Sequence, residues 1–258
     1  MARAIAICNQ KGGVGKTTTA VNVAAYLSLS GKRTLLVDLD PQGNATTACG
    51  IDRKTLERDL YDVLIDHLPI TEAIRKTRIE RFDIIPSSID LAGAEPALAR
   101  MNAGDRALQC AFETLRNQYD FILLDCPPSL GLLTVNALVC ADSTIIPVQC
   151  EYLALEGLSA LMKSVMLIKQ KLNPSLRVGG IVLTMTDFRA NLAKEVAEEV
   201  KKFFKELVFE TAIPRNIRLA ESPSFGNPIC VYDPDSAGAL AYQLLTNEVI
   251  AKESMLNP

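Results

Sequence analysis

The sequence contains a single histidine and no closely spaced cysteines. His67 lies in the stretch DVLIDHLP, away from any other candidate ligand, and none of the seven cysteines forms a C-x-x-C pair. A zinc site needs several such ligands at short spacing, and a Ser-His-Asp or Cys-His centre needs a histidine that acts on the nucleophile. The sequence therefore indicates neither kind of site, and we interpret His67 as a residue at the end of a helix.

Long apolar runs and a strong net charge are also missing. No apolar run approaches the roughly 18 residues that span a membrane, and the opening MARAIAICNQ has too short an apolar part for a signal peptide. We therefore expect no membrane association. The net charge is −3, so no overall basic field indicates a nucleic-acid partner.

Apolar runs rich in β-branched residues alternate with helical patterns along nearly the whole chain. We expect strands at residues 4–8, 34–37, 82–86, 121–124, 144–148, 178–184 and 208–213. We expect helices at residues 16–29, 91–101, 105–117, 153–172, 191–205 and 236–250. Strands that are apolar on both faces and separated by helices predict an α/β fold, with a mainly parallel twisted sheet covered by helices on both faces. No linker or repeat divides the chain, so residues 1–258 are predicted to form a single domain, and Pro147 is expected at a strand end.

The stretch NQKGGVGKTTT, residues 9–19, has the composition of a phosphate-binding loop. Glycines allow backbone N–H groups to converge on phosphate oxygens, and the N-terminus of the following helix adds positive potential. In such a loop Lys16 bridges the β- and γ-phosphates and the Thr17 hydroxyl binds Mg²⁺. The expected nucleotide-binding residues are Gly12, Gly13, Val14, Gly15, Lys16, Thr17 and Thr18. Two features depart from the ordinary pattern G-x-x-x-x-G-K-[ST], because Gln10 replaces its first glycine and a second lysine, Lys11, precedes the loop.

Three aspartates follow apolar strands. Asp125 ends the run FILLD, as does a Walker B aspartate that holds Mg²⁺ directly or through water, although a strand-end cap is the alternative. Asp38 and Asp40 lie in VDLDPQGN at the end of another strand, where open α/β sheets build their sites. Both carboxylates are expected near the γ-phosphate. The alternative is a simple turn, since Asp, Pro and Gly all favour turns.

Five segments in this order resemble the ParA/Soj chromosome- and plasmid-partitioning ATPases, which belong to the deviant-Walker-A branch of P-loop proteins. They are KGGVGKTT, VDLDPQGN, LLDCPPS, LTMTDFRAN and IPRNIRLAESPSFGNPI, and the resemblance covers nearly the whole chain. It implies a P-loop NTPase fold that uses ATP and Mg²⁺. It also implies a role for the second lysine: Lys11 is the signature residue that reaches across a dimer interface to the nucleotide held by the other subunit, as an arginine finger does.

The resemblance assigns roles to further residues. The catalytic set it implies is Lys11, Lys16 and Asp40, with Asp40 orienting the attacking water; the metal ligands are Thr17, Asp38 and Asp125. Met185, Pro214, Arg215 and Asn216 are expected around the adenine, and Arg189 and Arg218 on a surface that binds DNA without sequence preference. Composition does not itself favour the DNA surface, because residues 185–220 mix basic and acidic side chains as a solvated helix face does.

The function implied by the resemblance is an ATP-driven dimerisation switch. ATP closes a sandwich homodimer, the dimer binds DNA, and a ParB/Spo0J-type partner stimulates slow hydrolysis to ADP and phosphate. The free thiols and the nucleotide loop favour a cytoplasmic protein, which the resemblance places at the nucleoid. Three alternatives use the same loop: a MinD-like membrane-associated regulator, an iron–sulfur carrier, and a DNA-binding scaffold without turnover. The tail AYQLLTNEVIAKESMLNP has one lysine and two glutamates, unlike a basic membrane helix, and cluster-sharing cysteines are not recognisable.

Overall fold

The computed structural model describes residues 2–151, 154–187 and 189–255, and within them one sheet has the strand order β3-β4-β2-β5-β1-β6-β7. Its strands are β1 (Arg3–Ile7), β2 (Thr34–Asp38), β3 (Arg75–Lys76), β4 (Phe82–Ile85), β5 (Phe121–Asp125), β6 (Ser143–Gln149) and β7 (Arg177–Thr184). All neighbouring strands run parallel except β3, which is antiparallel to β4. The predicted α/β class and the mainly parallel sheet are confirmed.

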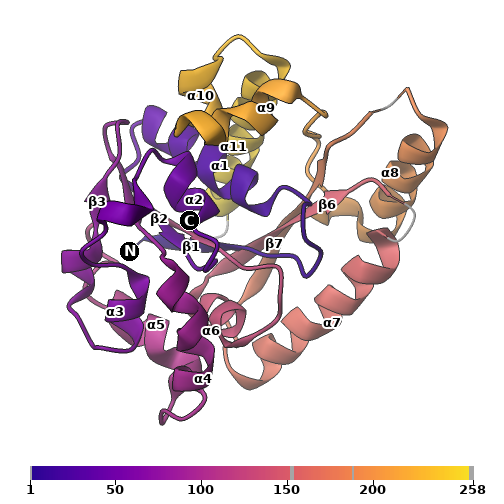
Figure 1. Cartoon of the computed structure of the whole chain (residues 1–258). Helices are drawn as coiled ribbons and strands as arrows, with labels where there is room; N and C mark the ends of the chain where they lie inside the picture. The colour runs from indigo at the N-terminus through magenta and orange to yellow at the C-terminus, as the bar shows by residue number, and fades with distance from the viewer. Residues whose placement is uncertain (1, 152–153, 188, 256–258) are drawn as a thin grey trace.

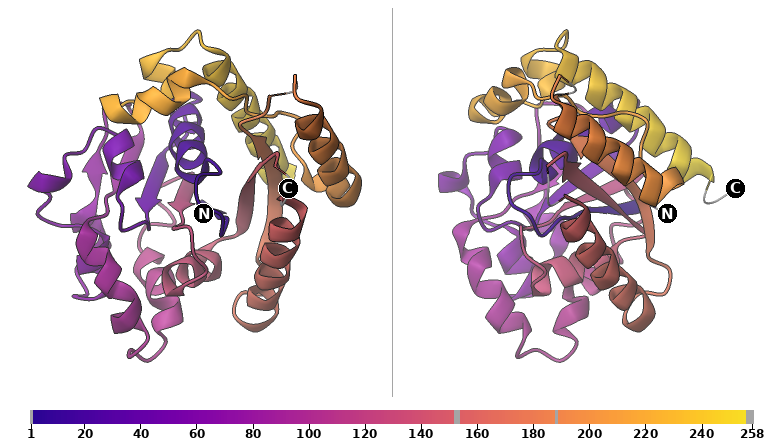
Figure 2. Two further views of the ribbon diagram at one scale, coloured as in Figure 1. Left: turned by 45° about the vertical axis from the view of Figure 1, so that its right-hand side comes forward. Right: turned by 90° about the vertical axis from the view of Figure 1, so that its right-hand side faces the viewer.

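Helices cover both faces of the twisted sheet (Figures 1 and 2). One face carries α1 (Lys16–Leu29), α2 (Asn44–Ala48), α9 (Ile217–Glu221), α10 (Ile229–Tyr232) and α11 (Ala237–Met255). The other carries α3 (Leu60–Leu64), α4 (Ala94–Leu98), α5 (Ala107–Phe112), α6 (Leu132–Cys140), α7 (Ala154–Lys171) and α8 (Asn191–Phe204). Short 3₁₀ turns are η1 (Arg53–Thr55), η2 (Ile70–Ala73), η3 (Ile89–Gly93), η4 (Gly104–Arg106), η5 (Lys205–Leu207) and η6 (Ser222–Phe225).

Two apolar cores lie on either side of the sheet because side chains alternate along each strand. In β1, Ile5 and Ile7 pack with α1 and α11, whereas Ala4 and Ala6 pack on the opposite side. Every residue of β2 and β5 is buried, which is why both strands read as continuous apolar runs. Within the described part of the chain, no helix combines the length and apolar character needed to cross a bilayer.

The predicted strand at 208–213 is wrong. This segment runs beside β7. The Phe209 amide donates to the Ile181 carbonyl and the Ile213 amide donates to the Leu183 carbonyl, so four residues of the segment span the length that two residues of β7 cover. The chain must bulge between these bonds, and only the isolated bridges Ile181–Val208 and Thr186–Pro214 remain.

Other differences concern the lengths and ends of elements. The helices predicted at 91–101 and 105–117 each begin as a 3₁₀ turn and continue as the short helices α4 and α5. The predicted start of α7 at residue 153 lies outside the described residues. Strand β3 has only two residues, both basic, so that no apolar pattern indicates it.

Pro147 lies inside β6, two residues before the end of the strand. It pairs with Val182 of β7, while the pairing of β6 with β1 stops at Ile145. The Pro147 carbonyl accepts a hydrogen bond from the Asn9 side chain at 2.7 Å, on the side where β1 has already ended. A missing N–H on that side removes no ladder bond, and this explains why the strand tolerates the proline.

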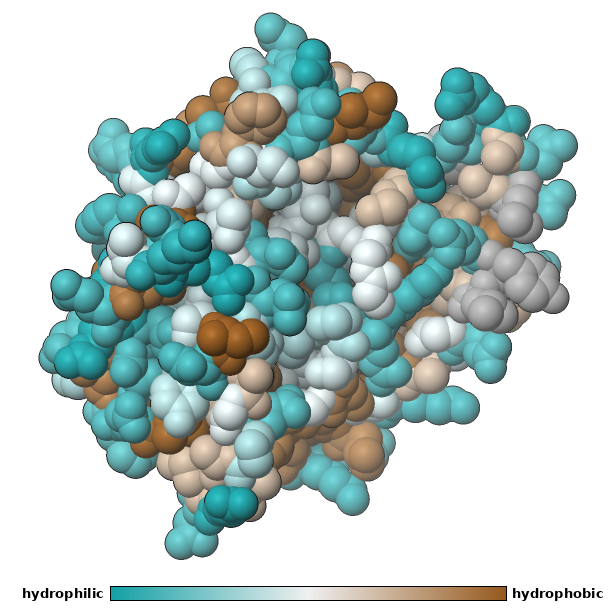
Figure 3. Space-filling model, viewed as in Figure 1, coloured by the Kyte–Doolittle hydropathy of each residue, from teal (hydrophilic) through white to brown (hydrophobic). Residues whose placement is uncertain are grey.

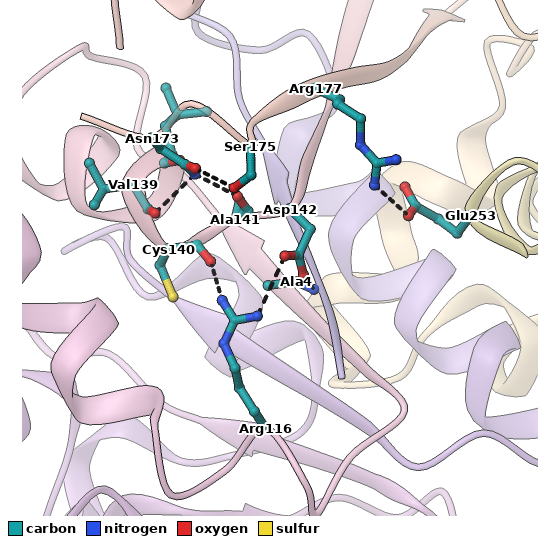
Figure 4. Close-up of polar contacts among 11 residues, drawn as sticks. Ala4, Arg116, Val139, Cys140, Ala141, Asp142, Asn173, Ser175, Arg177 and Glu253 are labelled. Carbon is teal, nitrogen blue, oxygen red and sulfur yellow. Dashed lines mark hydrogen bonds and ion pairs between the residues drawn. The ribbon is translucent and has the colours of Figure 1, made fainter. Parts of the chain in front are cut away.

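Polar side chains join elements at the amino edge of the sheet (Figure 4). Asn173 donates its amide group to the carbonyls of Leu138, Val139 and Ala141 at 2.8–3.0 Å, which satisfies the end of α6. Nearby, Glu253 of α11 is buried and accepts a hydrogen bond from Ser143 at 2.6 Å. These contacts fix the edge opposite to the one where the strands end in the predicted site residues.

Candidate functional site

The loop between β1 and α1 has a backbone that only glycine adopts readily. Gly13 and Gly15 have φ angles of 74° and 86°, in the left-handed region. Val14 is buried, and its carbonyl accepts a hydrogen bond from the Thr184 hydroxyl at 2.8 Å, which ties the loop to the end of β7. The amides of the first turn of α1 are thereby presented at a helix N-terminus, an arrangement suited to phosphate.

Lys16 and Lys11 have different surroundings although both belong to this loop. The Lys16 side chain is buried, and its Nζ donates to the Lys11 carbonyl at 3.1 Å. Burial lowers the pKa of Lys16, and the nearby Asp125 carboxylate opposes that shift. The Lys11 side chain is exposed and forms an ion pair with Glu151 at 2.5 Å, just beyond β6.

Asp38 and Asp125 are register partners at the carboxyl ends of neighbouring parallel strands. Both are completely buried. Among the described residues, neither carboxyl oxygen of Asp125 has a hydrogen-bond partner. Burial, followed by the proximity of Asp38, raises the pKa of Asp125 well above the ordinary value, while the nearby Thr17 hydroxyl opposes that shift. Asp38 accepts three hydrogen bonds, two of them from the Thr46 amide and hydroxyl at 2.8 and 2.7 Å, while burial raises its pKa to about 6. Asp38 thus anchors α2, whereas Asp125 is unsatisfied.

An oxygen-rich site with an unsatisfied buried carboxyl group fits a hard divalent cation. The Thr17 hydroxyl and the Asp125 carboxylate are the kinds of ligand that Mg²⁺ prefers. Among the described residues, no group of three or more His, Cys, Asp or Glu side chains is arranged to hold a metal. A cation here would therefore need phosphate and water oxygens to complete its coordination, as Mg²⁺ does when it binds with a nucleotide.

Asp40 lies on a turn that follows β2. The Gly43 amide donates to the Asp40 carbonyl at 2.8 Å, and the Gln42 amide donates to the Asp40 carboxylate at 3.0 Å. Asp with Pro and Gly at these spacings favours a tight turn, so the turn interpretation of the sequence is correct as far as it goes. The Asp40 side chain nevertheless lines the same cleft as the phosphate-type loop.

Two adjoining cavities collect most of the predicted residues. A cleft of 560 Å³ is lined by the loop, Asp40 and Met185, and a smaller pocket of 250 Å³ continues from it. The loop residues on the cleft are Gly12, Gly13, Gly15, Lys16, Thr17 and Thr18, and the predicted residues in the smaller pocket are Met185, Pro214, Arg215 and Asn216. Neither lining includes Lys11, Val14, Asp38 or Asp125. Neutral and hydrophilic residues cover the central part of this face in Figure 3, where Figure 1 draws the loop.

Met185 has a φ angle of 50°, an uncommon conformation for a non-glycine residue. It follows β7 and lines both cavities, so its side chain lies where they join. Asn216 uses its side-chain oxygen to cap α9, accepting the Leu219 amide at 3.2 Å. Strained backbone of this kind is frequent at ligand sites.

Known proteins resemble this chain along nearly its full length. A family model described as an AAA domain matches residues 2–178. The sporulation initiation inhibitor protein Soj of Bacillus subtilis is 53% identical over 251 residues, which cover 97% of this chain and 99% of Soj. The chromosome partitioning protein ParA of Myxococcus xanthus is 50% identical over 256 residues, which cover 99% of this chain and 90% of that protein. The chain belongs to the ParA/Soj family of chromosome-partitioning ATPases.

The fold of this ParA/Soj chain also has solved counterparts. The crystal structure of cobyrinic acid a,c-diamide synthase from Mycobacterium smegmatis with a bound ATP analog and magnesium has a TM-score of 0.87 and 34% identity. The match covers 100% of this chain and 98% of the other.

The two arginines expected on a ParA/Soj DNA surface are exposed and paired with acids. Arg189 donates to both carboxyl oxygens of Asp187 at 2.8 and 2.7 Å, and this pairing lowers the pKa of Asp187 to about 2. Arg218 forms ion pairs with Glu221 at 3.1 Å and Asp233 at 3.2 Å. Neither arginine lines the 560 Å³ cleft, so both lie on the surface outside that cleft.

Sequence reasoning missed one wall of the cleft. Ser222, Ser224 and Asn227 line it beside α2, although the segment that contains them was part of the family resemblance. This wall is fixed by a contact between Gly50 and Gly226, where a Cβ on either residue would lie 2.8 Å from backbone atoms of the other. Both glycines have positive φ angles. The glycines after α2 and after η6 were the signal, but their proximity follows only from the fold.

Proposed function

We propose that this protein is an ATPase that binds ATP with Mg²⁺, dimerises around the nucleotide, and binds DNA without sequence preference in that state. A ParB/Spo0J-type partner then stimulates hydrolysis and releases the subunits, and the cycle moves chromosomes or plasmids at the nucleoid in the cytoplasm. Membership of the ParA/Soj family supports this proposal. So does the ATP analog with magnesium in the related structure from M. smegmatis.

The observation that carries the proposal is the separation of the two loop lysines. Lys16 is buried in its own cleft, whereas Lys11 does not line that cleft and directs its ammonium group to Glu151. A lysine that begins a phosphate loop but lies outside its own cavity supports a role toward a second molecule. In a dimer it would add positive charge to the partner's nucleotide as the γ-phosphate leaves.

The other residues have distinct roles in this mechanism. The loop amides and Lys16 hold the phosphates, and Thr17 with Asp125 would hold Mg²⁺, which neutralises phosphate charge when bound. Asp40 orients the water that attacks the γ-phosphorus, so that ATP and water give ADP and phosphate. Asp38 as a direct metal ligand stays a prediction, because its oxygens already accept three hydrogen bonds.

The smaller pocket is proposed to hold the adenine. Pro214 and Met185 offer apolar surface, and the backbone near Asn216 offers polar groups. Arg189 and Arg218 are proposed to contact DNA phosphates, Arg189 after giving up Asp187 and Arg218 after giving up both of its acidic partners. Contacts of this kind depend on salt and do not read bases.

The test is DNA retardation by the purified protein with ATP, with ADP and without nucleotide, over a series of salt concentrations. DNA should shift only with ATP, and the affinity should fall steeply as salt rises. Arg189→Ala and Arg218→Ala should each reduce the salt slope by about one unit, with similar losses on unrelated sequences.

Arg33→Ala is the matched control, because Arg33 is also exposed and is paired with an aspartate, Asp120, at 3.0 Å. Arg33 lies just before β2, at the amino-terminal ends of the strands. Equal DNA binding in all nucleotide states would contradict the proposal. So would arginine variants that bind DNA as Arg33→Ala does.

A further inference from the structure

The turn that carries Asp40 is held by two side chains from outside the cleft. Three consecutive carbonyl oxygens accept their hydrogen bonds: Asp40 from the Ser87 hydroxyl at 2.8 Å, Pro41 from Arg53 Nη2 at 3.0 Å and Gln42 from Arg53 Nη1 at 2.5 Å. Within the described part of the chain, the guanidinium of Arg53 is committed to these carbonyls, and its Nε is buried without a partner. Arg53 itself lies on η1, outside the lining of the cleft.

We propose that Arg53 is a positioning residue for hydrolysis: by binding the Pro41 and Gln42 carbonyls it fixes the turn so that the Asp40 carboxylate faces the phosphates. This inference rests on the proposed ATPase function. Arg53 does not line the cleft, and in this proposal it acts through Asp40 alone.

The geometry explains why an arginine is needed at this position. The planar guanidinium presents two N–H groups in a fixed fork, which matches two neighbouring carbonyls that point the same way. Hydrogen bonds from a charged donor are roughly twice as strong as neutral ones, so the peptides of the turn resist rotation. Rotation of either peptide would displace the Asp40 carboxylate, and misplacement by about 1 Å can lower a rate by two orders of magnitude.

The lack of a side chain at Gly43 leaves room for the Arg53 guanidinium. Its φ angle is 61°, and a Cβ at this position would overlap the Arg53 guanidinium. The guanidinium therefore lies directly against the glycine Cα, and any side chain at residue 43 would force Arg53 away from the carbonyls. The contacts of Arg53 with the turn therefore require glycine at position 43.

Arg75 provides a matched control. Its guanidinium also binds backbone carbonyls, those of Glu72 at 2.8 Å and Ile74 at 3.1 Å, but it lies at β3 on the edge of the sheet. Arg75→Ala removes the same kind of contact without touching the Asp40 turn. A general loss of stability from removing an arginine that binds backbone carbonyls would appear in both variants.

The first experiment compares ATP turnover and ATP affinity in wild type, Arg53→Ala, Arg53→Lys and Arg75→Ala. We expect kcat to fall about tenfold in Arg53→Ala with little change in ATP affinity, because the lost interaction acts on the transition state. Added guanidinium ion should restore part of the activity of Arg53→Ala, whereas Arg53→Lys should stay impaired. Arg75→Ala should turn over as wild type does.

Two further measurements test whether Arg53 holds the Asp40 turn. Amide hydrogen exchange in the nucleotide-free protein should be faster at residues 40–47 in Arg53→Ala than in Arg75→Ala. Gly43→Ala should reduce kcat strongly in wild type and less in the Arg53→Ala background, because the overlap with the guanidinium is gone while the strain at φ 61° remains.

The outcomes separate the two proposals. If wild type does not hydrolyse ATP, the proposed function fails, and hydrogen exchange still decides whether Arg53 holds the turn. If wild type hydrolyses ATP but Arg53→Ala matches Arg75→Ala in turnover and exchange, Arg53 has no positioning role and only this inference is overturned.

Discussion

Asp125 is a residue whose position favours function over stability. A buried carboxyl group without hydrogen bonds costs free energy, and here a second carboxyl group, Asp38, lies beside it in the neighbouring strand. The ordinary place for such a cost is a site that a ligand completes. In the absence of metal and nucleotide, a neutral side chain of the same shape at position 125 should therefore raise the free energy of unfolding.

Asp125→Asn should stabilise the protein in the absence of metal and nucleotide by about 1–3 kcal/mol near neutral pH. The raised pKa fixes the sign of the pH dependence: wild type loses stability as the pH rises from the ordinary carboxyl value of 3.8 through the raised folded-state value of Asp125. The variant loses less, because only the loss from Asp38, whose pKa is also raised by burial, remains. Thermal unfolding in EDTA across this range measures the difference. A variant that is equally or less stable at every pH would mean that the buried carboxyl group costs nothing.

At the scale of elements, apolar pattern predicted the central strands and failed at the edges. β2 and β5 are buried at every residue, so their runs are unambiguous. The segment after α8 has a similar apolar run, Val208–Ile213, yet a bulge against β7 prevents a ladder. Register between chain segments depends on the neighbours that each meets, and a single sequence does not contain that information in readable form.

The end of α6 illustrates an element held by one side chain. Asn173 is buried and donates to three carbonyls that would otherwise be unsatisfied at the helix end. Asn173→Ala should therefore lower the free energy of unfolding by about 1–3 kcal/mol, measured by urea unfolding. Gln118→Ala is the control, because this exposed side chain binds a single carbonyl, Thr114, and its loss should be nearly neutral. Equal effects of the two variants would contradict the capping role.

For the molecule as a whole, sequence reasoning located the site better than it described its surroundings. Most of the loop residues, Asp40 and the residues that the family resemblance assigns to the base pocket line adjoining cavities, and their roles stay predictions. The engagement of Asp38 by Thr46 and the clamp of Arg53 on the turn were not foreseen. Both depend on side chains brought together by packing, and neither has a motif of its own.

The proposed trans role of Lys11 involves two molecules and is therefore tested on a mixture of two variants. Lys11→Ala subunits mixed with Asp40→Ala subunits should regain part of the ATP turnover, since the site in the Lys11→Ala subunit keeps Asp40 and receives the partner's lysine. Each variant alone should be nearly inactive and is its own control. Absence of turnover despite mixed dimers detected by cross-linking would show that Lys11 acts in its own subunit.

The contact between Gly50 and Gly226 packs the turn after α2 directly against residues 222–228. Because the two backbones touch with no side chain between them, there is no flexible layer to absorb a displacement, and packed interiors are barely compressible. A shift of α2, which follows Asp40 and is anchored by Asp38, is therefore passed directly to residues 222–228. That segment continues from α9, which carries Arg218. A displacement of either segment at this contact is therefore expected to move the other, because no side chain lies between the two backbones.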